Sequence, residues 1–323
     1  MSNLTIVMYH YVRDLGHSRY PEIKGLQTEL FEQQIAYIAK RYNPISAYDL
    51  MEAVVGGEEL PPKAILLTFD DAYIDHFKSV FPRLEKANIP ACFFPPAKCI
   101  LEHKVLDVNK IHFILASVAN KNDLVAAIYR SVQQNRTAYG LDPIEVYWER
   151  LAIENRRDPA EVVFVKRMLQ RELPTALRSI LTETLFKTFV TADELDFAQE
   201  LYMSVDQIAL LHSAGMYVGN HGFEHYWLDS LSEYQQRREI DLSLNFLRTI
   251  GSDTDRWIMC YPYGAYDKTT LRILREKNCT IGLTTRADIA NTSTDDPLIL
   301  PRLDTNDLPK SADAAPNEWM KKA

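Results

Sequence analysis

Two adjacent carboxylates, Asp70 and Asp71, stand at the end of an apolar run over residues 64–69. Such a run is typical of a buried strand, and α/β proteins build their sites at the carboxyl ends of parallel strands. Neighbouring residues point in different directions, so one carboxylate could bind a metal ion while the other faces a substrate. An isolated Asp-Asp pair is more often a solvated loop or a helix N-cap. The pair therefore needs support from elsewhere in the chain.

Two histidines four residues apart, His221 and His225, follow a second apolar run over residues 216–220. Positions separated by four lie on one side of a helical turn, so both imidazoles can reach one ion. Imidazole is a preferred ligand of zinc and of neighbouring transition metals. Together with the Asp pair, the histidines predict a metal centre. The same segment also spells H-x-x-E-H through Glu224, a metallopeptidase pattern in which the Glu is the base.

Two further features carry weaker signals. Tyr261-Pro262-Tyr263-Gly264 follows an apolar run at 257–261 and forms a turn that could leave backbone N–H groups facing a ligand, as an oxyanion hole requires. A plain turn into the next helix explains this segment equally well. Arg302 lies near a strand-like run late in the chain, where by itself it would be read as a surface salt bridge.

Together these segments resemble the polysaccharide deacetylases, the NodB-homology group of carbohydrate esterases. The segment Thr-Phe-Asp-Asp that ends at Asp71 matches the family's T-F-D-D motif. The resemblance implies that Asp70 is the general base and that Asp71 is a metal ligand. The segment from His221 to His225 resembles the H-[S/T]-x-x-H motif, which implies two further metal ligands.

The remaining motifs match with departures. Gly222 stands where the second motif has a hydroxyl residue, which removes a hydrogen bond that braces the loop but removes no ligand. The Tyr-Pro-Tyr-Gly segment resembles the family's third motif. That likeness implies that the Tyr263 N–H holds the oxyanion, with substrate-binding positions at Tyr261, Pro262 and Gly264.

Two family residues are replaced in this chain. Many members carry an Arg before the third motif, where this chain has Cys260, and they place a general-acid His near the C-terminus, whereas no His follows His225. Met-Tyr-His at the N-terminus, ending in His10, resembles the opening of a circularly permuted branch that is similar to poly-N-acetylglucosamine deacetylases. This likeness implies that His10 is the general acid. Arg302 resembles a late Pro-Arg arginine of that branch, which implies contact with Asp70.

Strand-like and helix-like patterns alternate along most of the chain, which predicts an α/β fold with a parallel sheet. The family resemblance implies a distorted (β/α)7-type barrel formed by residues 1–99 and 202–323. The stretch 100–201 shows successive helical patterns and no strand pattern, so we expect an α-helical insertion beside the site mouth. The tail after Leu308 is expected to be loosely held. The predicted strands are 4–9, 64–69, 91–94, 216–220, 257–261 and 280–284, and the predicted core helices are 30–42, 47–55, 74–87, 204–214, 232–250 and 268–277.

Composition narrows the classes of partner. The chain has 323 residues, and its formal charge of -8 with no basic run argues against nucleic acid or an anionic membrane surface as the main partner. No segment approaches the roughly 20 apolar residues of a membrane span. The N-terminus lacks a signal-peptide pattern, and the four cysteines occur singly, so we expect a cytoplasmic protein without disulfides or a thiolate zinc site.

The predicted function is metal-dependent N-deacylation, the hydrolysis of a linear amide C–N bond in an N-acyl amino sugar. The acyl group could be acetyl or formyl, and the sugar nucleotide-linked, lipid-linked or a surface-glycan precursor. One divalent ion is expected; zinc is favoured, and cobalt, nickel, iron or manganese could occupy the same ligands. A homo-oligomer stays open. The alternatives are a metallopeptidase that uses Glu224, a non-sugar amide hydrolase of the same fold, and a non-enzymatic carbohydrate-binding protein.

Overall fold

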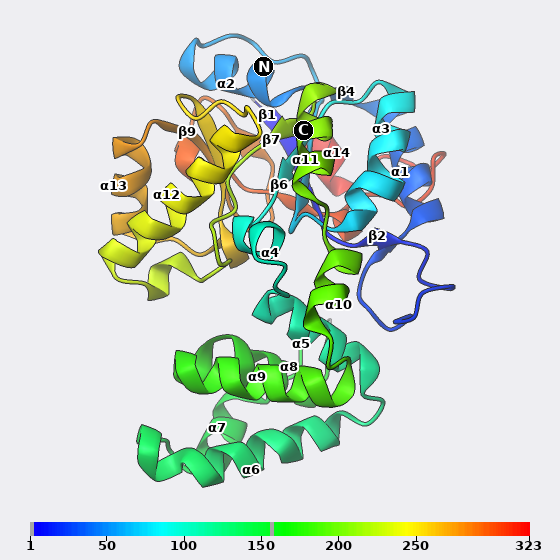
Figure 1. Cartoon of the computed structure of the whole chain (residues 1–323). Helices are drawn as coiled ribbons and strands as arrows, with labels where there is room; N and C mark the ends of the chain where they lie inside the picture. The colour runs from blue at the N-terminus through cyan, green and yellow to red at the C-terminus, as the bar shows by residue number, and fades with distance from the viewer. Residues whose placement is uncertain (1–2, 156–157) are drawn as a thin grey trace. The chain divides into compact units, whose positions relative to one another are not determined.

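The computed structural model describes residues 3–155 and 158–323. The chain forms two compact units (Figure 1). The first contains the residues through Asp14, Gly25–Lys104 and Ala198–Ala323, and the second contains Leu15–Lys24 and Val105–Phe197. Every candidate site residue of the sequence lies in the first unit.

A seven-stranded sheet forms the centre of the first unit, with the order β10-β1-β5-β6-β7, β11 beside β1 and β4 beside β5. All pairs are parallel except β1 with β10. The longest pairing joins β1 and β5, from Leu4 opposite Ala64 to Tyr9 opposite Phe69. Every residue of β5 is buried, as its continuous apolar sequence predicts for an inner parallel strand. The strands are β1 (Asn3–Tyr9), β4 (Asn43–Pro44), β5 (Ala64–Asp70), β6 (Ala91–Phe94), β7 (Tyr217–Val218), β10 (Ala290–Asn291) and β11 (Leu303–Asp304).

Two separate parallel pairs accompany this sheet. One joins β8 (Trp257–Cys260) to β9 (Cys279–Leu283), and the other joins β2 (Val12–Arg13) to β3 (Leu26–Gln27). Single bridges link Asn220 to Met259 and Leu283 to Leu300, so the β8-β9 pair is connected to the sheet region on two sides. The predicted α/β class is confirmed. The strands form a sheet and a pair joined by single bridges, and not one continuous closed sheet.

Four core helices begin where the sequence carries a capping box, in which a side chain at the N-cap and one three residues later bind each other's backbone N–H groups. Ser46, Ser204, Ser232 and Asp267 are these N-caps, for α2, α11, α12 and α13. A π-helical turn, η1, precedes α3. The helices of this unit are α1 (Thr28–Arg41), α2 (Ala47–Val55), η1 (His76–Val80), α3 (Phe81–Ala87), α4 (Ala97–Leu101), α11 (Val205–Ser213), α12 (Glu233–Thr249), α13 (Lys268–Glu276) and α14 (Glu318–Lys322), with short 3-10 turns η3 (Leu228–Ser230), η4 (Pro262–Gly264), η5 (Pro297–Ile299) and η6 (Thr305–Asp307).

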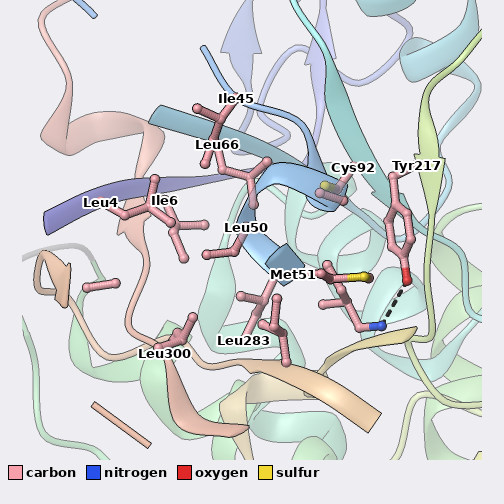
Figure 2. Packing of buried hydrophobic residues seen from close by; sticks show 14 of the residues in the cluster. Leu4, Ile6, Ile45, Leu50, Met51, Leu66, Cys92, Tyr217, Leu283 and Leu300 are labelled. Carbon is pink, nitrogen blue, oxygen red and sulfur yellow. Dashed lines mark hydrogen bonds between the residues drawn. The ribbon is translucent and has the colours of Figure 1, made fainter. Parts of the chain in front are cut away.

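Helix α2 packs on the sheet through a buried apolar cluster (Figure 2). Leu50 and Met51 of α2 lie in this cluster with Leu4 of β1 and Leu66 of β5, and all four are fully buried. The Tyr217 hydroxyl accepts a hydrogen bond from the Ile258 N–H at 2.8 Å. This bond is the dashed line at Tyr217 in Figure 2. The cluster therefore fixes strands whose carboxyl ends carry the candidate site residues.

Among its described residues, the second unit has helices as its only regular secondary structure. Three of its helices begin directly after a proline N-cap, at Pro143, Pro159 and Pro174. Lys110 is buried and forms ion pairs with Glu183 and Glu194. The helices are α5 (Asp107–Ser117), α6 (Lys121–Tyr139), α7 (Ile144–Leu151), α8 (Ala160–Arg167), η2 (Met168–Glu172) and α9 (Thr175–Phe189), and α10 (Glu194–Leu201) crosses the boundary between the units.

Residues 15–24 belong to the second unit, which the range predicted for the insertion did not include. The Tyr20 ring packs edge-on against Phe113 and Phe197, at centroid distances of 5.0 and 5.9 Å. Lys24 forms an ion pair with Asp158. These contacts tie an early segment to helices that lie much later in the chain, and local sequence patterns carry no sign of them.

The tail after Leu308 is not loosely held, so that expectation was wrong. Met320 of α14 is buried, and its sulfur accepts a hydrogen bond from the Tyr37 hydroxyl at 3.2 Å. The Gln34 amide donates to the Leu308 carbonyl at 3.3 Å. The tail is held as well by the Ala312 N–H, which donates to Gln33 Oε1 at 3.1 Å. Among the helices of the described chain, none is long and apolar enough to cross a bilayer.

Candidate active site

The candidate residues from separate segments meet at the carboxyl ends of the parallel strands. His10 follows β1, Asp70 ends β5 and Asp71 follows it, and Cys260 ends β8. His221 comes shortly after β7. Parallel strands place their carboxyl ends at one edge of a sheet, which explains why residues so distant in sequence become neighbours.

Asp71, His221 and His225 form a buried cluster. The Nε2 atoms of His221 and His225 lie 3.5 and 3.3 Å from Asp71 Oδ1. The two imidazole rings are 4.8 Å apart and inclined by 72°. One donor atom from each of the three residues lies within 4.8 Å of the others. The sequence predicted these three as metal ligands, and the structure brings them together.

Hydrogen bonds orient the cluster from outside. His221 Nδ1 is 2.7 Å from the Cys260 carbonyl, so this nitrogen donates and Nε2 is left to face Asp71. The Tyr73 hydroxyl donates to Asp71 Oδ2 at 2.6 Å. Asp71 Oδ1 is buried and has no hydrogen-bond partner among residues 3–155 and 158–323. A buried carboxylate oxygen that no donor satisfies, next to two imidazole nitrogens, fits a divalent cation.

The ionisation states of Asp71 and His225 suit a metal. Burial would lower the pKa of His221, but Cys260, Asp71 and Asp70 raise it well above its usual value, so this imidazole must release a proton when it binds an ion. Burial by itself would raise the pKa of Asp71, but the adjacent imidazoles of His221 and His225 hold it well below its usual range. Burial lowers the pKa of His225 to about 3, so this imidazole is neutral near pH 7. An ionised carboxylate and a neutral imidazole are the forms that bind metal.

Asp70 and Arg302 form a bidentate pair that is almost completely buried. Arg302 donates to Asp70 Oδ1 at 3.0 Å and to Oδ2 at 2.8 Å. The same guanidinium donates to the Thr284 carbonyl and to the Thr68 hydroxyl, at 2.9 and 3.0 Å. Burial would raise the pKa of Asp70, but Arg302 more than offsets this and holds it below its ordinary value. Asp70 is therefore ionised and fixed in orientation.

Cys260 touches the same carboxylate, since its thiol lies 3.4 Å from Asp70 Oδ1. Many of the polysaccharide deacetylases that the chain resembles have an Arg at the position of Cys260. Here the guanidinium comes instead from Arg302, far along the chain and just before β11. The contact between Arg302 and Asp70 that the resemblance implied is thus present.

His10 lies beside Asp70, with Nε2 3.9 Å from Asp70 Oδ2. Its side chain is 42% exposed, whereas that of Asp70 is 2% exposed, so His10 is the member of this pair that an incoming molecule can reach. His76 Nε2 lies 2.9 Å from the His10 carbonyl. Burial lowers the pKa of His76 to about 4, so the ring is neutral and can donate to that carbonyl. The strand that precedes His10, β1, pairs with β11, which begins directly after Arg302.

In the Tyr-Pro-Tyr-Gly turn, Tyr263 lies at the candidate site, whereas Tyr261 lies in the core. Tyr263 places its ring edge-on to His225 at 4.7 Å and stacks on Trp227 at 4.4 Å. Tyr261 is fully buried and its hydroxyl donates to the Leu298 carbonyl at 2.7 Å, which argues against the substrate contact predicted for it. Pro262 is also buried. Gly264 has φ +71, and a Cβ there would lie 2.3 Å from Thr285 Oγ1, so only glycine fits.

Left-handed backbone is concentrated in this site. Of the eight non-glycine residues with positive φ in the described chain, four lie in the three motif segments or directly after one: Asp71 at 73°, Ala72 at 55°, His225 at 59° and Tyr263 at 58°. Non-glycine residues in this region of φ/ψ space store strain that the surroundings must offset, and such residues cluster at active sites. Asp, His and Tyr carry no turn signature strong enough to have predicted it.

Sequence reasoning missed several residues that orient the site. Tyr73 and His76 hold Asp71 and His10, and their closeness to the Asp pair in sequence was the only signal for them. Glu239 lies in the middle of α12 and accepts hydrogen bonds from the loop of the two histidines. A Glu within a helix that also carries many exposed charges gave no sign of this role.

Glu224, the base in the metallopeptidase alternative, is engaged elsewhere. Its carboxylate forms an ion pair with Lys98 and accepts a hydrogen bond from the Tyr226 hydroxyl at 3.0 Å. It is not a member of either potential metal-binding group found in the described residues. The geometry therefore disfavours the metallopeptidase alternative.

Comparison with known proteins agrees with this site. The sequence profile of the family described as polysaccharide deacetylase matches residues 57–133 and 180–282, which is more than half of the chain. A curated relative, the poly-beta-1,6-N-acetyl-D-glucosamine N-deacetylase of Escherichia coli, is 33% identical over 90 residues. That match covers 28% of this chain and only 13% of the relative.

Solved structures share the fold at low identity. The deacetylase PplD of Streptococcus pyogenes, in complex with acetate, superposes with a TM-score of 0.59 at 18% identity, over 96% of this chain and 95% of that one. IcaB from Ammonifex degensii gives a TM-score of 0.55 at 19% identity, over 94% and 91%. With the family profile matching both the Asp-Asp and the His-x-x-x-His segments, the chain belongs to the polysaccharide deacetylase family of hydrolases.

Proposed function

We propose that the protein is a metal-dependent N-deacetylase that acts on an N-acylated amino sugar. The observation that carries this proposal is the pair of adjacent carboxylates. Asp70 is buried and kept ionised by Arg302, and Asp71 faces two imidazoles. One carboxylate is thereby available as a base, and the other as a metal ligand. The chain's membership of the family supports the same division of roles.

Asp71, His221 and His225 would hold the ion, with zinc as the first expectation. Three protein ligands are typical of catalytic zinc sites, which keep a further position open. When bound, the ion would act as a Lewis acid toward the acyl carbonyl and would make a water molecule easier to deprotonate. Cobalt, nickel, iron or manganese would use the same ligands.

The remaining residues have proton-transfer and binding roles in this proposal. Asp70 accepts the proton of the attacking water, because Arg302 keeps it ionised and oriented. The Tyr263 N–H supports the oxyanion, since preorganised donors stabilise charge that develops in the transition state. His10 protonates the departing nitrogen, a step that matters because an amide anion is a very poor leaving group.

The substrate class follows from the family and from the curated relative, whose name gives poly-beta-1,6-N-acetyl-D-glucosamine. For this chain we propose an N-acetyl or N-formyl amino sugar, nucleotide-linked, lipid-linked or as a surface-glycan precursor in the cytoplasm. We also propose that the bridges Asn220 to Met259 and Leu283 to Leu300 complete a distorted barrel around the site.

The test is a mass-spectrometric screen of acetylated and formylated amino sugars, their oligomers and their nucleotide conjugates for loss of the acyl group. Zinc-loaded protein should deacylate at least one of them. Asp70→Asn should abolish turnover, whereas Glu224→Gln should leave much of it. Loss of activity in Glu224→Gln alone would favour the peptidase alternative. Activity only on amides without a sugar would move the substrate outside the proposed class, and protein that binds no metal and turns over nothing would contradict catalysis altogether.

A further inference from the structure

The segment from His221 to His225 has an unusual backbone that needs support from outside. Gly222 has φ +72 and His225 has φ +59, so the chain enters the left-handed region twice within five residues. Gly222 also stands where the motif has a hydroxyl side chain, so this loop lacks the brace that the resemblance would supply. The two imidazoles can keep their orientation only if other groups hold the loop.

The backbone of this loop is held by the Asn220 side chain, by the start of α4 and by Glu239 of α12. The Asn220 side chain accepts from the Gly222 N–H at 2.8 Å. The first residues of α4 donate to loop carbonyls, Ala97 N–H to Gly222 at 3.3 Å and Lys98 N–H to Phe223 at 3.0 Å. These bonds leave two further N–H groups between the histidines, those of Phe223 and Glu224.

Glu239 of α12 accepts both of them through one oxygen. Its Oε2 lies 3.0 Å from the Phe223 nitrogen and 2.8 Å from the Glu224 nitrogen. A Cβ on Gly222 would come within 3.4 Å of the same oxygen. Glu239 therefore lies against the loop at the position that the glycine leaves open.

Burial of Glu239 has a cost that the fold alone does not explain. The side chain is 4% exposed, and no Lys or Arg in the described parts of the chain forms an ion pair with it. Burial raises the pKa of Glu239 to about 7, although the two backbone hydrogen bonds lower it. A carboxyl oxygen accepts hydrogen bonds whether the group is charged or neutral, so bracing the loop requires only that the oxygen reach both N–H groups.

We propose that Glu239 is a positioning residue that fixes the two histidine ligands by binding the N–H groups between them, in place of the hydroxyl that Gly222 lacks. The inference rests on the proposed function, because it assumes that His221 and His225 bind the metal. It assigns to the middle of α12 a role in metal affinity that exposed residues of the same helix do not share.

The experiment measures zinc affinity by competition with a chromophoric chelator, which needs no substrate. Glu239→Ala should weaken binding about 10- to 100-fold, the usual effect of losing a group that orients a ligand. Glu239→Gln should bind nearly as wild type does, because its amide oxygen can accept both N–H groups. Glu239→Asp keeps the charge but is one methylene shorter, so it should resemble Ala. Glu233→Ala, at an exposed position of α12, is the matched control and should not change affinity.

The outcomes separate the two proposals. If wild type does not bind zinc, or His225→Ala binds it as tightly as wild type does, the proposed function fails. If His225→Ala loses zinc while Glu239→Ala keeps wild-type affinity, only the role of Glu239 fails. If circular dichroism shows that Glu239→Ala does not fold, the zinc affinities of Glu239→Gln and Glu239→Asp still decide. Wild-type affinity in Glu239→Asp together with weakened affinity in Glu239→Gln would show that the charge of residue 239 matters and its reach does not. That result would overturn the inference.

Discussion

Asp70 and Arg302 illustrate what tertiary structure adds to a residue's chemistry. Both side chains are nearly inaccessible, with exposures of 2% and 1%. A buried charge without its partner is costly, and removing one member of such a pair typically destabilises a protein by about 3–5 kcal/mol. Arg302 therefore holds Asp70 ionised and oriented, and Asp70 in turn makes burial of the arginine tolerable. Sequence alone would have assigned Arg302 to the surface, and only the family resemblance linked it to Asp70.

The pair predicts a specific change in pH dependence. In the wild type, Arg302 holds the pKa of Asp70 below its ordinary value, so Asp70 is ionised throughout the neutral range. Arg302→Met leaves burial as the main influence, and burial raises the pKa of a carboxyl group. A protonated Asp70 cannot accept a proton, so the acid limb of the kcat/KM profile should move to higher pH, and the maximal rate should fall.

A pH-rate profile of both proteins tests this expectation. Arg272→Met is the control, since Arg272 is half exposed and pairs with Glu233 and Glu276 on the surface. It should leave the profile unchanged. An acid limb that stays in place in Arg302→Met would show that Asp70 is not the base.

His10 predicts a loss of rate without a loss of metal. It contacts Asp70 but belongs to no metal-binding group of the described residues. His10→Gln should keep fold and zinc affinity while turnover falls about 10²- to 10⁴-fold, the usual contribution of a positioned acid or base. His103→Gln, at an exposed position in the same unit, is the control and should leave turnover and zinc affinity unchanged. Wild-type turnover in His10→Gln would remove both the acid role and the permuted relationship from which it was inferred.

At the level of elements, the turn after β8 depends on a glycine. Gly264 has φ +71, and a Cβ would meet not only the Thr285 hydroxyl but also its backbone nitrogen, at 2.9 Å. A side-chain atom can rotate aside, whereas a backbone atom can move only if the chain itself shifts. Gly215 also has positive φ, at +87, but a Cβ there would meet nothing within 4 Å. A substitution at Gly215 therefore tests backbone strain alone, whereas one at Gly264 adds a steric clash.

We therefore expect Gly215→Ala to cost about 1–2 kcal/mol, the usual strain of a left-handed residue with a Cβ. Gly264→Ala should cost more in urea unfolding and should also reduce kcat/KM strongly, because it shifts Tyr263 beside His225. Both glycines lie in the first unit, so one unfolding transition reports on both. Equal destabilisation by the two changes would mean that the close approach to Thr285 relaxes freely.

Element prediction from sequence succeeded where hydrophobic patterns were long. The predicted strands at 64–69 and 91–94 correspond to β5 and β6, and the helix at 47–55 is α2. The two-residue strands β10 and β11 were missed, because so short a pairing has no periodicity and exists only through its partner β1. The predicted helix at 74–87 contains a π turn, which the pattern of apolar residues does not distinguish from α-helix.

For the site, the sequence pointed to the side chains that the structure brings together as candidates for the chemistry, but not to most of those that orient them. Asp71 and His221 could be predicted because metal binding restricts both residue type and spacing. Tyr73 and Glu239 could not, because a side chain that holds another may come from any element that packs nearby. The left-handed backbone of Asp71 and Tyr263 was also invisible, since it is imposed by surrounding structure.

At the scale of the whole molecule, the candidate metal-binding residues belong to one unit only. Among the described residues, both potential metal-binding groups draw on strands and loops of the first unit. A ligand that binds only the native state stabilises it by about 2.7 kcal/mol at a hundred times its Kd. Zinc added to metal-stripped protein should therefore slow amide hydrogen exchange in peptides that contain β5 and the loop of His221. Exchange in α6 and α9 should not change, and His225→Ala should show no zinc effect in either unit.

The same measurement tests the role predicted for the helical insertion. If the second unit borders the site mouth, substrate added to zinc-loaded Asp70→Asn should slow exchange in its helices as well, because this variant is expected to bind substrate without turning it over. Protection that appears with substrate and is absent with zinc alone would tie the insertion to substrate choice. Unchanged exchange in α5–α9, alongside clear protection near His10 and Tyr263, would exclude a substrate role and leave an oligomer contact as the remaining expectation. Exchange at two protein concentrations would then distinguish that contact, since only subunit association depends on concentration.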